Sequence, residues 1–81
     1  MPSPTFRIRT GRDFGLVVRE RREELGITQA ELAEQSGIDS PSGLSRIENG
    51  KSVKHLEQVL TALQRLGARV EVTFPDEPSD G

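Results

Sequence analysis

Helix-start and helix-stop signals crowd the middle of this 81-residue chain, and they constrain its fold more than any other feature. Thr28 is a suitable N-cap, and Glu31, three residues later, can complete a capping box with it. Gly37 is typical of a helix C-terminus with positive φ. Ser40 and Pro41 then restart a helix, as N-cap and as first helical residue. The pattern predicts two short helices joined by a turn of three to four residues.

The second of these helices has an apolar and a polar face. Leu44 and Ile47 lie three residues apart and are expected to face inward. On or near the outer face remain Ser42, Ser45, Arg46 and Asn49. Small side chains let a helix approach another surface closely, and an arginine can bridge O6 and N7 of guanine. The helix therefore has the features of one that reads base edges in the major groove of DNA.

The motifs TQAELAEQSGI and LSRIENGK together resemble those of the Cro/phage-repressor (XRE) family of helix-turn-helix proteins. The resemblance covers roughly residues 14–67 and implies an all-α, lambda-repressor-like domain of four to five helices. It implies that Gln29 bonds a phosphate, and that Arg22 forms a structural ion pair with Glu48 of the ENG motif. This chain departs from the family in its IDSPSG segment, which is one residue longer and places Pro41 and Gly43 where polar readers are commoner.

The predicted DNA contacts follow from the outer face, the helix starts and the nearby lysines. They are Thr28, Gln29, Ser40, Ser42, Gly43, Ser45, Arg46, Asn49, Lys51 and Lys54. Arg46 is the expected base reader, while Lys51 and Lys54 are expected at phosphates. The structural alternatives are an ordinary exposed residue for Gln29, a C-cap for Asn49, and a solvated or phosphate-bound side chain for Arg46.

Charge and composition bear on the class of function. A net charge of −2 is unusual for a nucleic-acid-binding domain. However, residues 1–22 hold six arginines against two acids, and residues 40–56 hold three basic residues against one acid. Local charge governs phosphate contact more than the total does. With one histidine, no cysteine and no glycine-rich phosphate loop, the chain has no recognisable nucleophile–base pair, cofactor motif or zinc site, so we expect neither an enzyme nor a cofactor.

The flanks predict three further elements. Thr10 can cap a first helix with Asp13 near its third position, and Ser52 is expected to start a last helix. That last helix carries an apolar stripe, expected to be core, of Leu56, Val59, Leu60, Leu63 and Leu66. Alternating Val70, Val72 and Phe74 predict a strand.

The C-terminal strand needs a partner, because a lone strand leaves backbone groups unpaired. We expect it to pair with its copy across a homodimer, through Val70, Val72 and Phe74. The alternative partner is the alternating segment FRIRT near the N-terminus, itself a short strand or a frayed arm. The expected organisation is an arm (1–10), a helix-turn-helix domain (11–67), a dimerisation strand (68–75) and a disordered acidic tail (76–81).

The ending LQRLGARVEVTF resembles the HipB-like antitoxins, whose dimers form through a short intersubunit sheet. This resemblance implies a repressor that binds an inverted-repeat operator as a homodimer and neutralises a toxin, either a HipA-like kinase or a RelE-like ribonuclease. The alternatives are a free-standing phage-type or restriction–modification controller, and a protein-interaction module without DNA affinity. With no cysteine, no signal-peptide pattern and no long apolar run, we expect no membrane partner and a cytoplasmic, nucleoid-associated location.

Overall fold

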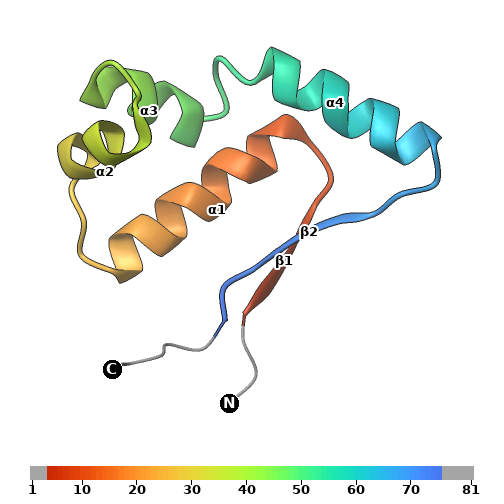
Figure 1. The fold of residues 1–81 in the computed structure, drawn as a ribbon, viewed down its shortest axis with the longest axis horizontal. Helices are drawn as coiled ribbons and strands as arrows, with labels where there is room; N and C mark the ends of the chain where they lie inside the picture. The colour runs from red at the N-terminus through yellow and green to blue at the C-terminus, as the bar shows by residue number, and fades with distance from the viewer. Residues whose placement is uncertain (1–3, 76–81) are drawn as a thin grey trace.

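The computed structural model describes residues 4–75, which form four α-helices and a two-stranded sheet (Figure 1). In chain order the elements are β1 (Thr5–Ile8), α1 (Gly11–Glu24), α2 (Gln29–Ser36), α3 (Pro41–Glu48), α4 (Lys54–Arg65) and β2 (Val70–Thr73). The mainly helical domain with a C-terminal strand is thereby confirmed. The acidic tail expected to be disordered lies outside the described residues.

Reciprocal capping fixes where α1 and α2 begin. The Thr10 hydroxyl accepts from the Asp13 amide, and the Asp13 carboxylate accepts from the Thr10 amide at 3.0 Å. Thr28 and Glu31 repeat the arrangement at α2, with bonds of 2.9 and 3.0 Å. Each box satisfies two amide donors that a helix start leaves unpaired, so these two boundaries follow from local sequence.

The turn between α2 and α3 comprises residues 37–40 and has the predicted signals at both ends. Gly37 has φ of 74°, a left-handed conformation that favours glycine. The Ile38 amide donates to the Ala33 carbonyl at 2.9 Å, which closes the end of α2. The Ser40 hydroxyl accepts from the Gly43 amide at 3.2 Å, and Pro41 is the first residue of α3.

The two strands pair within one chain. β1 and β2 are antiparallel, with Thr5 opposite Thr73 and Ile8 opposite Val70. The C-terminal strand was expected to pair with its copy in a second subunit, but in the structure it pairs with the N-terminal segment, the alternative partner. The side chains expected at a dimer interface, those of Val70, Val72 and Phe74, pack instead against the chain's own buried cluster of Ile8, Val17 and Leu60.

The last helix departs from expectation at its start and on its apolar face. It begins at Lys54 rather than at Ser52, which has φ of 59°, and its N-cap Val53 provides no side-chain hydrogen bond. Within its apolar stripe only Leu60 is buried. The residues of the stripe that are exposed are Leu56, Val59, Leu63 and Leu66. Periodicity identified the apolar face correctly, but residues 4–75 leave most of that face uncovered.

Among the described residues, no helix combines the length and the apolar character needed to cross a membrane.

Candidate nucleic-acid interface

The outer face of α3 carries the polar residues that its sequence pattern places there. Leu44 and Glu48 are buried against the rest of the domain. On the opposite side Ser42, Arg46 and Asn49 are exposed and Ser45 is half-buried. No ion pair of Arg46 is found within residues 4–75, so its guanidinium is available to an external acceptor. The structure thus presents one long basic side chain among small polar ones.

The N-terminal end of α3 is more constrained than the middle of its outer face. The Ser40 hydroxyl caps the helix and lies 3.2 Å from the Ser42 hydroxyl. Gly43 lies over Ile38, and a Cβ added to Gly43 would approach Ile38 Cγ2 to 3.2 Å. Ser40 and Gly43 therefore have a structural role in shaping the helix start, whether or not they also contact DNA. Thr28, another predicted DNA contact, likewise has a structural role as the N-cap of α2.

A partly buried polar cluster, centred on buried Glu48, ties α3 to α1 and α2. Arg22 donates from Nε to Glu48 Oε2 at 2.7 Å and from Nη2 to Glu48 Oε1 at 3.1 Å. Gln29 Nε2 also donates to Glu48 Oε1, at 3.0 Å, and Arg22 Nη1 donates to the Ile27 carbonyl at 2.9 Å. We call Arg22, Gln29 and Glu48 the clamp. The clamp connects α3 to α1 and α2 and so determines the direction in which α3 points.

The ionisation of the clamp is fixed by its geometry. Burial raises the pKa of Glu48, but the hydrogen bonds from Arg22 and Gln29 outweigh it, and the pKa is lowered. The bond to Glu48 raises the pKa of Arg22 despite its burial. Both groups are therefore charged near neutral pH. A two-bond arginine–carboxylate pair also fixes orientation, so the clamp holds α3 in a defined direction.

The backbones of α1 and α3 approach closely at Gly15. A Cβ placed on this residue would overlap the Ile47 carbonyl oxygen and would lie 3.1 Å from Glu48 Cα. Only glycine fits between the two helices here. Ile47, whose backbone Gly15 approaches, is adjacent in sequence to Glu48 of the clamp. The clamp and Gly15 together therefore position the C-terminal half of α3.

Basic side chains surround the C-terminal end of α3. Gly50 has φ of 80°, and the following Lys51 amide donates to the Arg46 carbonyl at 2.7 Å. Arg12 of α1 lies across Gly50, where a Cβ added to the glycine would approach Arg12 Cγ to 2.9 Å. Arg12 was not singled out from the sequence. The available signal was its spacing of three residues before Gly15, which places both on the side of α1 that faces α3.

Asn49 and Lys54 complete this end of the site. The Asn49 side chain donates to the Ser45 carbonyl at 2.8 Å. Asn49 is the C-cap residue of α3, the role that the sequence analysis gave as the alternative to a DNA contact. Lys54 is exposed at the start of α4. Four exposed basic residues make no ion pair in the described part of the chain: Arg12, Arg46, Lys51 and Lys54. They supply unneutralised positive charge beside α3, where phosphates would lie if α3 entered a groove.

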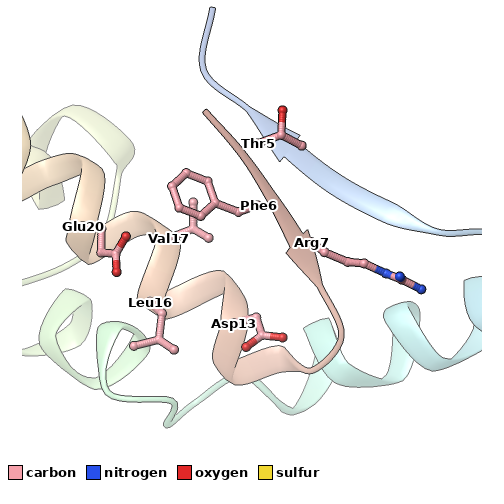
Figure 2. Close-up of a pocket in the computed structure, with 7 residues that line it drawn as sticks. All are labelled: Thr5, Phe6, Arg7, Asp13, Leu16, Val17 and Glu20. Atoms are coloured by element: carbon pink, nitrogen blue, oxygen red, sulfur yellow. The ribbon is translucent and has the colours of Figure 1, made fainter. Parts of the chain in front are cut away.

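A separate groove of about 330 Å³ lies between β1 and α1 (Figure 2). Figure 2 shows Phe6 directed toward α1 and Arg7 directed away from it. Its lining residues are Thr5, Phe6, Arg7, Asp13, Leu16, Val17 and Glu20, none of which belongs to the predicted DNA contacts. The groove is therefore distinct from the surface formed by α3.

Comparisons with known proteins agree with this geometry. Residues 13–73 match the family model described as a helix-turn-helix domain. The chain is 38% identical over 74 residues to an uncharacterized HTH-type transcriptional regulator, y4mF, of Sinorhizobium fredii, an alignment that covers 88% of this chain and 92% of that protein. No solved structure matches. The family match spans the caps at Thr28 and Ser40, the clamp and the outer face of α3.

Proposed function

Because the chain belongs to the helix-turn-helix domain family, we propose that it is a sequence-specific DNA-binding transcriptional repressor. The observation that carries the proposal is the outer face of α3, where exposed Arg46 stands among small polar side chains on a helix held by the clamp. A helix held in a fixed direction can repeat the same base contacts at every site. The family and this surface both favour binding rather than catalysis.

The proposal assigns different tasks to the basic residues. Arg46 projects from the middle of the outer face and reads a base edge, most simply guanine O6 and N7. Lys51 and Lys54 follow α3 and contact phosphates, which set position rather than sequence preference. Gln29 contributes less directly, since its amide nitrogen donates to Glu48. Its role is chiefly to steady α3.

The proposed repressor acts as a homodimer on an inverted repeat. Two copies related by a two-fold axis would place two α3 helices in major grooves about one helical turn, ~34 Å, apart. A single eight-residue recognition helix reads few base pairs, so doubling the contacts is the simplest route to operator specificity.

Within this class we propose an antitoxin that represses its own operon and binds a toxin, a HipA-like kinase or a RelE-like ribonuclease. The support is the resemblance of the C-terminal segment to HipB-like antitoxins, together with the acidic sequence that follows it. The toxin would occupy surface away from α3, so that DNA and toxin can be bound together.

The experiment is a fluorescence-anisotropy titration with DNA from immediately upstream of the gene, at ~150 mM salt with competitor DNA. We expect a Kd of ~10⁻⁸ M or tighter. Arg46→Ala should cost ~1–3 kcal/mol and relax preference at one base pair. Lys51→Ala should weaken all sequences alike and reduce the salt slope by about 1.

Arg65→Ala is the matched control, because Arg65 is a basic residue at the far end of α4 from α3. It should bind operator as the parent does. Equal losses for Arg46→Ala and Arg65→Ala would mean that charge alone, and not the α3 face, governs binding. Operator affinity no better than that for competitor DNA would reject autoregulation. Co-purification with the product of a neighbouring gene would then separate the antitoxin role from that of a free-standing regulator.

A further inference from the structure

Helix α4 exposes a row of four large apolar side chains. The exposed fractions are 41% for Leu56, 59% for Val59, 38% for Leu63 and 82% for Leu66. Their spacing is three, four and three residues, which aligns them along one side of the helix. We call these four residues the α4 stripe. Alternating steps of three and four are the spacing by which one helix packs along another.

No part of the described chain covers the α4 stripe. Leu60, on the adjacent side of α4, is 2% exposed and belongs to the cluster with Ile8 and Val17. The helix has therefore already used one side to join the domain. Its remaining apolar side faces outward, in a domain whose few fully buried apolar residues form a small core. Small domains of this kind are commonly completed by a second subunit.

We propose that the α4 stripe binds the α4 stripe of a second copy of this chain, with the two helices antiparallel across a two-fold axis. The stripe has the same three-four-three spacing from either end, so it is complementary to itself when reversed. Leu56 would then face Leu66 of the second copy, and Val59 would face Leu63. A surface that pairs with its own copy in this way is the definition of an isologous interface.

The location of the α4 stripe fits this occupant. In Figure 1, α4 extends away from α2 and α3, so a second copy bound along it leaves the recognition helix free. The inward side chains of β2 are not available for this purpose, since Val70 and Val72 pack on the chain's own core. The dimer surface inferred here is thus the exposed face of α4 and not the apolar face of β2.

The size of the α4 stripe sets the strength of the contact. Its four exposed fractions together equal about two fully exposed side chains. A stable interface buries ~800 Å² on each partner, which is far more. The dimer is therefore weak in free solution, with a dissociation constant above ~1 µM. If the proposed function holds, operator DNA with two half-sites would strengthen the dimer, because it would hold both copies close together.

The test compares two leucines in matching positions. Leu66 and Leu25 are both C-cap residues, of α4 and α1, and each precedes a glycine with positive φ. Leu25 is also exposed, at 54%, but lies outside the stripe. Sedimentation over about 1–300 µM should show a monomer–dimer equilibrium for the parent and for Leu25→Lys. Leu66→Lys and Val59→Lys should weaken dimerisation at least tenfold, with unchanged circular dichroism.

Monomeric parent protein at every concentration, or Leu66→Lys dimers as stable as those of Leu25→Lys, would overturn the inference. DNA binding is measured separately on single and paired half-sites. If the stripe variants keep half-site affinity and lose only cooperativity, both proposals hold. If the parent dimerises through the stripe yet binds no DNA, the proposed function fails alone. If it binds DNA with no dependence on Val59 or Leu66, the dimer surface fails alone.

Discussion

Helices α3 and α4 both pack against α1, but by different kinds of contact. α3 meets α1 through the backbone at Gly15 and through two hydrogen bonds between Arg22 and Glu48. α4 meets it through side chains, including a single 3.3 Å bond from the Gly11 amide to Glu57. The first set of contacts is specific in direction, because it requires particular atoms at particular distances. The second set allows the neighbouring side chains to adjust.

The difference matches the base-reading role proposed for α3. A helix that reads bases must keep its direction, and directional contacts such as the clamp are suited to this. Helix α4 has no such requirement toward α1, and its apolar surface is shared between the domain core and the uncovered α4 stripe. The domain therefore combines a firmly oriented helix, for which we propose base reading, with a helix whose packing is incomplete within residues 4–75.

The largest expected effect comes from removing the carboxylate of the clamp. Glu48→Ala leaves the largely buried Arg22 guanidinium without its main charge partner, which we expect to lower the free energy of unfolding by ~3–5 kcal/mol. Glu57→Ala, the equivalent change on α4, removes one part-buried hydrogen bond and should cost less than ~1.5 kcal/mol. Urea denaturation of the two variants compares them directly. Equal losses would show that α3 and α4 are held with similar strength.

A smaller effect is expected from two glycines of α1. Gly15→Ala places a methyl group against the Ile47 backbone, which cannot move without α3, and should cost ~1–3 kcal/mol. Gly11→Ala places it against the Glu57 and Val53 side chains, so the Glu57 side chain must shift. Because that shift disturbs the hydrogen bond from the Gly11 amide to Glu57, Gly11→Ala should cost about 1 kcal/mol at most, less than Gly15→Ala. Thermal unfolding of both variants gives the measurement. The comparison fails if Gly11→Ala is the more destabilising of the two.

Local signals in the sequence predicted the helix-turn-helix well. Caps such as Thr10, Thr28 and Ser40 act within a few residues of themselves, so their partners can be identified without a fold. Ser52 was the exception: a serine before an apolar stripe suggested a cap, but the chain turns there with positive φ and the helix starts two residues later. A tight turn after Gly50 overrode the local preference.

Long-range features were harder to predict. Apolar periodicity shows which side of α4 is apolar, but not whether this chain or another covers it. The partner of β2 was left open for a similar reason, because alternation specifies a strand and not its neighbour. The position of Arg12 across Gly50 depends on how α1 crosses α3, which neither motif contains. Each of these features depends on contacts between residues that are distant in sequence.

The smallest predicted effect is a dependence of stability on pH that arises from Glu48 of α3. Since the pKa of Glu48 is lowered in the folded chain, its charged form stabilises the fold above the ordinary glutamate pKa of about 4.3. That stability is lost as the pH falls through the lower, folded value. Glu31, whose pKa is lowered by its bonds to Thr28, acts in the same direction at the exposed start of α2. As the pH is lowered from 7 to 3, thermal midpoints should therefore fall less steeply for Glu48→Gln than for the parent. A parent-like slope in Glu48→Gln would show that the clamp carboxylate does not contribute to acid sensitivity, and that α3 is held chiefly by the backbone contact at Gly15.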